Sequence, residues 1–450
     1  MEERSNFTGK IGFVLAAAGS AVGLGNIWRF PYLAAKYGGG IFLLVYLILA
    51  VTFGFALMAA EIALGRKTGL SAIGAFQKLN KKFAFIGYLG AIVPMIILPY
   101  YCVIGGWVTK YFWAFTSGQA GASASDSFFS EFIARPAEPV LWFALFLGLT
   151  AIVVMLGVEK GIESVSKIMM PVLVVLSVIV AAYSAFLPGA KAGILYYILP
   201  DFKKFSSTTV LAAMGQMFYS MSIAMGIMIT YGSYMKKDVN LESSVKQIEL
   251  FDTGIAFLAG FMIIPAVFVF SGGNSEALGK GPGLMFVTLP KVFASMNGGT
   301  IIGWLFFLLV FFAALTSSIS LMETVVSIVC DKAKIGRIPS SLLVFLWSIL
   351  LGIPSSLGFG VWDGVKILGM SFLDFFDFLS NSVLMPITAF LTSIFVGYVI
   401  KPKAVIDEVE ISSRFKRKRL FTAVIKYIAP ICIVLILISS VLDAMGILKI

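Results

Sequence analysis

This sequence is built from long apolar runs that are separated by short polar breaks. About 20 consecutive apolar residues are enough for an α-helix to cross a lipid bilayer. Eleven runs of 16 to 33 residues are present, at about 11–36, 41–64, 84–115, 140–157, 165–187, 208–234, 246–270, 300–330, 339–354, 368–400 and 421–448. They lack the ten-residue alternation of transmembrane β-barrel strands. We therefore predict an all-α membrane protein with eleven transmembrane helices.

The composition excludes a soluble protein and narrows the possible chemistry. Hydrophobic residues make up 59% of the 450 residues and charged residues 13%, whereas soluble domains have about 25% charged residues. The absence of histidine excludes a histidine-ligated metal site or proton relay. Cys102, Cys330 and Cys432 lie far apart and form no CxxC motif or disulfide framework. Because an intramembrane enzyme would need a nucleophile with a base or a metal, we predict that the chain is not an enzyme.

Lysine and arginine are distributed unevenly between the two sides of the predicted helices. The N-terminal segment and every second loop hold 22 of them, and the opposite loops hold 8. This bias predicts a multi-pass protein of the cell membrane with its N-terminus in the cytoplasm and, after eleven spans, its C-terminus outside. The net charge of +11 comes from short clusters such as 414–419, so we expect the lipid bilayer as partner, no nucleic acid and no obligate protein partner. Arg29 and the lack of an A-x-A exit argue against a cleavable signal peptide.

Two of the runs are interrupted near their centres. Residues 19–31 read GSAVGLGNIWRFP, and residues 215–226 read GQMFYSMSIAMG. They interrupt the first and sixth runs. These two runs occupy corresponding positions if helices 1 to 5 and 6 to 10 form two halves. Such interruptions predict a midplane binding site in an inverted-repeat transporter. The alternative is that Gly19 and Gly23 only form a close-packing helix face, which does not account for Asn26 and Arg29.

Further polar residues lie inside the runs. Residues 313–320 read AALTSSIS, and their hydroxyls either bond back to the preceding helical turn or supply hard oxygen ligands to sodium. Asp252 in the seventh run must pair with a cation, be protonated or contact water, unless the helix begins after it. Glu61 and Glu323 are expected to be hydrogen-bonded acids of helix packing.

Charges near the two ends of the runs could form gates. Asp374 or Asp377 could pair with Arg29 on the outer side, and Arg4 could pair with Asp331 on the inner side. Solvated surface charges are the alternative.

The segment 21–32, AVGLGNIWRFPY, resembles the neurotransmitter:sodium symporter family, in particular its bacterial amino-acid transporters and an eleven-helix subgroup. The resemblance covers nearly the whole chain. It implies a five-plus-five inverted repeat with unwound helices 1 and 6. The implied divisions are a core at 1–400 with repeats at 1–190 and 205–400, a basic cytoplasmic loop at 401–420 and an eleventh helix at 421–450.

The resemblance also implies two sodium ions and a set of ligands. The first sodium site would use Ala21, Asn26, Ser220 and Asp252 together with the substrate carboxylate. The second would use Gly19, Val22, Ala313, Thr316 and Ser317. The substrate carboxylate would meet backbone N–H groups near Leu24 and Gly25 and the Tyr101 hydroxyl. Its ammonium would meet backbone carbonyls near Ala21, Phe218 and Met221 and the Ser222 side chain. The side-chain pocket would be lined by Ile97, Tyr101, Tyr219, Met225, Ser317, Ser320 and Leu321. The implied gates are Arg29 with Asp377 outside and Arg4 with Asp331 inside.

Two positions indicate the substrate and the ions. Family members that carry monoamines have an aspartate at the position of Gly23, so glycine favours an amino acid whose own carboxylate completes the first sodium site. Asp252 and Ala256 stand where chloride-dependent relatives have asparagine and serine, so no chloride requirement is expected. A proton taken up by Asp252 on the return step would be counter-transported. We predict a sodium-coupled symporter that imports a hydrophobic or aromatic amino acid; the alternative is a sodium-independent exchanger or facilitator.

Overall fold

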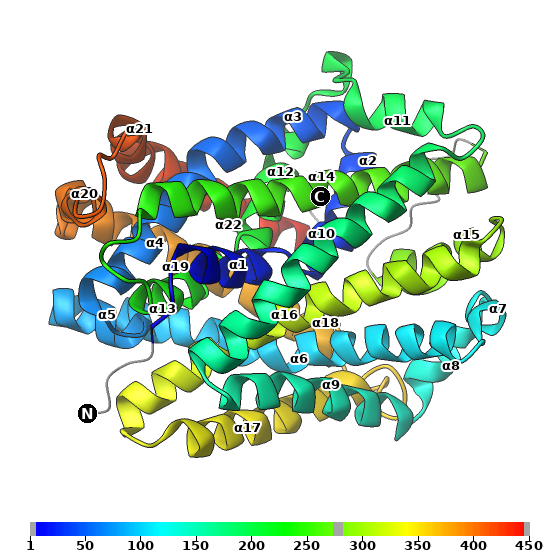
Figure 1. Ribbon diagram of the computed structural model, residues 1–450, viewed down its shortest axis with the longest axis horizontal. Helices are drawn as coiled ribbons and strands as arrows, with labels where there is room; N and C mark the ends of the chain where they lie inside the picture. Colours follow the sequence, from blue (N-terminus) through cyan, green and yellow to red (C-terminus); the bar gives the residue numbers. More distant parts are fainter. Residues whose placement is uncertain (1–5, 273–281, 445–450) are drawn as a thin grey trace.

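The chain folds into a bundle of helices, most of which run roughly along its long axis (Figure 1). The computed structural model describes residues 6–272 and 282–444. Within these residues there is no β-strand, only isolated bridges between Gly39 and Pro200 and between Ile367 and Met370. The all-helical prediction is thus confirmed for the described chain.

The elements are α-helices (α) and short 3₁₀- or π-helical segments (η). The first half contains α1 (Lys10–Ala21), η1 (Gly25–Arg29), α2 (Phe30–Lys36), α3 (Gly40–Leu49), η2 (Ala50–Gly54), α4 (Phe55–Thr68), α5 (Ala72–Leu79), η3 (Lys81–Phe83), α6 (Ala84–Thr116), α7 (Ala120–Ser123), α8 (Phe128–Ala134), α9 (Glu138–Met155), η4 (Val158–Glu163), α10 (Ser164–Ala185) and α11 (Lys191–Ile198). The second half contains η5 (Phe202–Lys204), α12 (Ser207–Ser220), α13 (Ile227–Ser233), α14 (Leu241–Phe270), η7 (Leu284–Thr288), α15 (Leu289–Ala294), α16 (Gly299–Ala333), α17 (Arg337–Leu357), α18 (Phe372–Asp377), η8 (Phe378–Leu384), α19 (Met385–Ile394), η9 (Phe395–Val399), α20 (Lys401–Glu410), α21 (Lys418–Ala423), η10 (Val424–Ile428) and α22 (Ala429–Ala444).

The described residues contain nine helical segments that are long and apolar enough to cross a membrane. A tenth is obtained when Lys10–Ala21 and Gly25–Lys36, which meet at an angle of 54°, are taken as one bent span. The predicted sixth run forms α12 and α13 instead, and these have only 14 and 7 residues. The described chain therefore has nine or ten such spans by length and apolarity, fewer than the eleven predicted.

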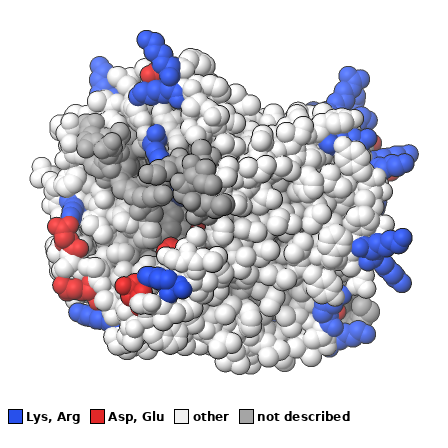
Figure 2. Space-filling view, turned by 180° about the vertical axis from the view of Figure 1, so that it is seen from behind, with Lys and Arg blue, Asp and Glu red and all other residues white. Residues whose placement is uncertain are grey.

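On the face of the molecule seen in Figure 2, charged side chains avoid the middle. Figure 2 shows lysine and arginine gathered at two opposite ends, with a broad uncharged band between them. Large apolar side chains such as Leu141, Ile152 and Ile168 are exposed to 58–68%. Such a band is what a lipid-facing surface requires, because lipid replaces water around it.

The two breaks in the helices are held open by different means. In the first, α1 ends at Ala21 and Val22 adopts an extended conformation. In the second, Ser222 and Ala224 have φ of 54° and 64°, a left-handed conformation that is unfavourable for residues other than glycine. Ala224 is fixed there because its N–H donates a hydrogen bond of 2.7 Å to Oε1 of the buried Glu61.

The two breaks face each other across the centre of the bundle. The Ser222 hydroxyl donates to the Ser20 carbonyl at 3.0 Å, and the Ser20 hydroxyl lies 3.1 Å from that of Ser222. The long helix α16 passes beside them, where the Ser320 hydroxyl donates to the Ser20 hydroxyl at 2.7 Å. Non-helical backbone inside a membrane needs such protein partners, since lipid offers none.

Candidate substrate and sodium site

A small cavity of about 30 Å³ lies where the two breaks meet α6 and α16. This is room for about one or two water molecules. The residues that line it are Ser20, Ala21, Gly23, Leu24, Gly25, Asn26, Ile97, Tyr101, Tyr219, Ser220, Ser222, Met225, Ile227, Ser317, Ser320 and Leu321. The cavity is therefore lined by segments that are up to 301 residues apart in the sequence.

Most of the residues predicted to bind substrate lie around this cavity. They are Ala21, Leu24, Gly25, Ile97, Tyr101, Tyr219, Ser222, Met225, Ser317, Ser320 and Leu321. Ser20 and Ile227 line it too but were not predicted. Ser20 was recognisable as a polar residue beside the first break, whereas nothing in the sequence distinguishes Ile227.

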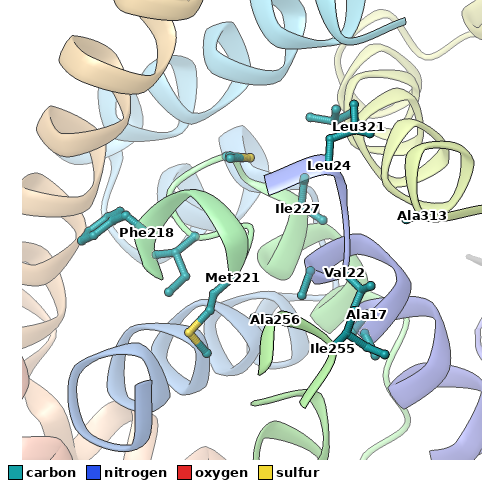
Figure 3. Packing of buried hydrophobic residues seen from close by; sticks show 14 of the residues in the cluster. Ala17, Val22, Leu24, Phe218, Met221, Ile227, Ile255, Ala256, Ala313 and Leu321 are labelled. Carbon is teal, nitrogen blue, oxygen red and sulfur yellow. The ribbon is translucent and has the colours of Figure 1, made fainter. Parts of the chain in front are cut away.

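Phe218 and Met221 are predicted substrate residues that do not line the cavity. Figure 3 shows Phe218 on α12, well separated from Leu24 and Leu321. The Phe218 ring packs against Phe53, with 5.5 Å between the ring centroids. The Met221 sulfur lies close to Gly54, where a Cβ atom would be only 2.4 Å away. Both side chains thus pack toward the helix that contains η2. The prediction concerned the backbone carbonyls at these positions, and it stays a prediction.

Glycine is needed at positions 23 and 25 because neighbouring side chains are very close. A Cβ atom on Gly23 would lie 2.7 Å from the Ser317 hydroxyl oxygen and 3.0 Å from the Tyr101 hydroxyl oxygen. A Cβ atom on Gly25 would lie 2.6 Å from the Tyr219 ring. The Leu24 N–H donates to the Tyr101 hydroxyl at 3.4 Å, so a backbone donor and a phenol meet at one wall of the cavity.

The structure brings the side chains predicted for the first sodium site together. The Asn26 amide donates to Oδ1 of Asp252 at 2.7 Å, and the Ser220 hydroxyl donates to Oδ2 at 3.4 Å. Tyr46 was missed by the sequence analysis; its hydroxyl donates to Oδ2 of Asp252 at 3.0 Å and lies 2.9 Å from that of Ser220. All four residues are at most 3% exposed. A tyrosine in an apolar run carries no sign of this role, because its partners come from helices far along the chain.

The oxygens predicted for the second sodium site also gather in one place. The Ser317 hydroxyl lies 3.2 Å from the carbonyl oxygens of both Gly19 and Val22. The Thr316 hydroxyl lies 3.2 Å from the Ala313 carbonyl oxygen. Among the described residues no group of three or more Cys, Asp or Glu side chains could hold a metal ion. Neutral oxygens of this kind suit an alkali cation, which prefers hard ligands.

The residues predicted to form the outer gate are Arg29 and Asp377. They form no ion pair with each other in the part of the chain that the structure describes. The Arg29 guanidinium lies 5.2 Å from the centre of the Tyr219 ring. Asp377 accepts hydrogen bonds from Tyr100 at 3.1 Å and from Asn381 at 2.6 Å. Arg29 and Asp377 share a cavity of about 60 Å³ but, within the ranges that the structure describes, form no ion pair.

Asp331 and Asp374 each accept hydrogen bonds from described residues. Asp331 accepts hydrogen bonds from the backbone N–H and the hydroxyl of Ser71, at 2.9 Å and 2.5 Å. Arg4, its predicted partner, lies outside the described residues. Asp374 accepts a hydrogen bond of 2.7 Å from the Ser371 hydroxyl. This contact lies in the first turn of α18.

Glu323 is a buried acid of helix packing, as predicted. Its carboxylate forms an ion pair with Arg337 and accepts a hydrogen bond of 2.7 Å from the Tyr234 hydroxyl. This network joins α16 to α17 and to the end of α13 on the side of the cavity away from Arg29.

Comparison with known proteins shows to which class this geometry belongs. A sequence model of the Sodium:neurotransmitter symporter family matches residues 4–134 and 124–447. The chain belongs to this family. The resemblance in segment 21–32 is thereby confirmed, and the protein is a sodium-dependent, multi-pass membrane transporter rather than a member of an enzyme class.

Individual relatives match this protein over almost its whole length. It is 35% identical over 443 residues to the uncharacterized sodium-dependent transporter YhdH of Bacillus subtilis (strain 168), covering 96% of each chain. It is 33% identical over 457 residues to an uncharacterized sodium-dependent transporter of Haemophilus influenzae, covering 98% of each chain. Its structure is similar to the crystal structure of MhsT in complex with L-phenylalanine, with a TM-score of 0.88 and 39% identity over 97% of this chain and 100% of that one.

Proposed function

We propose that this protein is a sodium-coupled symporter that imports a hydrophobic or aromatic amino acid by alternating access. The observation that carries the proposal is the meeting of two broken helices around one cavity, with two groups of buried oxygens beside it. Free peptide groups at the breaks offer donors to a carboxylate and acceptors to an ammonium group, as a zwitterion requires.

We propose two sodium ions, one at Asn26, Ser220 and Asp252 and one at Thr316 and Ser317 with the adjacent carbonyls. The substrate carboxylate would complete the first site, so that sodium and substrate favour each other's binding by linkage. Each sodium ion that moves inward down 100 mV contributes about 2.3 kcal/mol, or roughly 50-fold accumulation. This contribution is sufficient to drive uptake against a gradient.

The substrate class rests on Gly23 and on the apolar wall of the cavity. Gly23 has no side chain that would compete for the position beside Tyr101 and Ser317, where we place the substrate's own carboxylate. Ile97, Met225 and Leu321 supply apolar contacts, and the MhsT structure contains L-phenylalanine. Because 30 Å³ is too small for such a side chain, the pocket must widen when substrate binds. The flexible Met225 side chain is suited to that adjustment.

We propose that the protein crosses the cell membrane eleven times, with its N-terminus in the cytoplasm. The pair α12 and α13 supplies the additional crossing, because its interruption at 221–226 is supported from within the protein by Glu61 and Ser20. The two breaks would then occupy equivalent positions in the repeats 1–190 and 205–400.

Replacing sodium with potassium outside proteoliposomes is expected to abolish accumulation of radiolabelled amino acids. In the proposed mechanism the sodium gradient drives uptake, so accumulation stops when that gradient is removed. A sodium-independent exchanger or facilitator would continue to transport in potassium. The substrate is found first, by measuring which of the twenty amino acids raises the thermal unfolding temperature in sodium.

Replacing chloride with gluconate is expected to leave the uptake rate unchanged. The Asp252 carboxylate already places a negative charge beside the proposed first sodium site, and Ala256 offers no hydroxyl to a chloride ion. A collapse of uptake in gluconate would contradict this account of charge balance while leaving sodium coupling intact.

A further inference from the structure

The segment 401–417, predicted as part of a basic loop, is partly helical and tightly attached to other helices. It contains α20, which lies beside α4 at one end of the bundle (Figure 1). Helix α20 has a buried apolar face, which consists of Pro402, Val405 and Val409, whereas Lys403 and Asp407 are exposed. A loop that only connected two spans would need no such buried face.

A buried ion pair joins α20 to α4. The Arg66 Nε atom lies 2.9 Å from Oε1 of Glu408, and the two side chains are 0% and 2% exposed. Arg66 also donates to the Glu408 carbonyl and, at 2.9 Å, to the Val239 carbonyl in the loop before α14. Lys237 from the same loop adds a second cation 2.6 Å from the Glu408 carboxylate. Separating these charges would leave a buried ion without its partner, which is strongly unfavourable.

The residues after α20 are attached to the same helices. The Lys416 N–H donates to the Glu242 carboxylate in the first turn of α14 at 2.8 Å. Phe415 is 1% exposed and packs near Phe55 of α4, and the Arg417 guanidinium lies 4.8 Å from the centre of the Phe55 ring. The attachment thus extends from Glu408 to Arg417.

The spans on either side of this segment are attached to each other instead. The Ser393 hydroxyl of α19 donates to the Ile425 carbonyl at 2.8 Å, and the Tyr398 hydroxyl donates to the Lys426 carbonyl at 2.6 Å. Lys401, the first residue of α20, has a φ of 65°, which is unusual for a residue other than glycine. Such a junction residue is a natural point for a change in backbone direction.

We propose that segment 401–417 is a cytoplasmic latch that moves as one body with α4 and the start of α14 and turns about Lys401. The proposal rests on alternating access as proposed above. In each transport cycle the latch and α4 would move together relative to the inner ends of α19 and α22. Uptake would therefore depend on residues that lie far from the substrate cavity and contact neither sodium nor substrate.

Distances between spin labels test whether the latch moves with α4. Labels are placed in pairs at the exposed Lys67 (end of α4), Asp407 (α20) and Lys334 (between α16 and α17), with Cys102, Cys330 and Cys432 replaced. Exchange of sodium for potassium in proteoliposomes is expected to leave the distance between positions 67 and 407 unchanged. The distances from each of these positions to 334 are expected to shift together.

A change in the distance between positions 67 and 407 would overturn the proposal, as would constant distances for all three pairs. Sodium-driven uptake by the same labelled protein separates the two proposals, since a lack of uptake would instead count against the symporter function.

A pair of matched variants tests whether the ion pair holds the latch. Glu408→Gln is expected to broaden the distribution of distances between 67 and 407 and to lower the uptake rate at least 10-fold. Glu410→Gln, which changes an exposed acid on the same helix, is expected to alter neither. Equal distance distributions and equal uptake rates for the two variants would contradict the proposed role of Glu408. If Glu408→Gln does not fold, the label distances in the protein with its native ion pair still decide whether the latch and α4 move together.

Discussion

Asp252→Asn is expected to reduce sodium-driven uptake by roughly 100-fold. The carboxylate is fully buried, and sodium bound beside it would lose its charged partner. Loss of one member of a buried ion pair costs about 3 kcal/mol or more, which corresponds to a factor of about 100 or more in affinity. The measurement is the sodium concentration that gives half-maximal uptake in proteoliposomes.

Two further variants separate charge from hydrogen bonding at this site. Tyr46→Phe removes the hydrogen bond to Asp252 but keeps the carboxylate, so a smaller loss of about 10-fold is expected. Asp252→Asn combined with Ala256→Ser is expected to recover uptake only when chloride is present, because the anion then replaces the missing charge. Normal uptake by Asp252→Asn in gluconate would show that the carboxylate is not part of the sodium site.

Asp252→Asn also tests whether protons are counter-transported. If Asp252 carries a proton on the return step, uptake by the native protein depends on internal pH and the residual uptake of the variant does not. A native protein without pH dependence would contradict proton counter-transport by this residue.

Gly23→Ala is expected to weaken amino-acid binding by about 10- to 100-fold. The added Cβ atom would lie 2.7 Å from the Ser317 hydroxyl oxygen and 3.0 Å from the Tyr101 hydroxyl oxygen, in the space proposed for the substrate carboxylate. Overpacking at a tight position costs about 1–3 kcal/mol. The measurement is the concentration of radiolabelled amino acid that half-saturates binding in sodium.

Gly254→Ala is the matched control, because a Cβ atom at that position in α14 meets nothing within 4 Å. It is expected to bind substrate like the native protein. Equal affinities for both variants would show that the carboxylate lies elsewhere. A general loss of stability would instead lower the unfolding temperature of Gly23→Ala in the absence of substrate.

The spans and the first break could be predicted because each depends on residues that are neighbours in the sequence. A bilayer selects long apolar runs whatever surrounds them, so most predicted runs appear as helices. The sixth run is the instructive exception. It was recognised as interrupted, but its separation into a helix of 14 residues and one of 7 depends on Glu61 and Ser20, which hold the open backbone.

The candidate site was predictable only as far as the family motif reached. Gly23, Asn26 and Tyr101 lie where the resemblance implied, around the cavity. Phe218 and Met221, whose backbone carbonyls were predicted to meet the substrate ammonium, do not line the cavity. The order of residues does not show how an interrupted helix is rotated relative to its neighbours.

The sequence by itself determined that this is a helical membrane protein with backbone left open in mid-span, because apolar length and misplaced polar residues are properties of each segment alone. Only the tertiary structure decided that Tyr46 joins Asp252 and Ser220, and that Arg66 is buried against Glu408. Those partners are between 174 and 342 residues apart. A buried polar group must find a partner wherever the packed helices provide one, and that choice is made by packing rather than by neighbours in the chain.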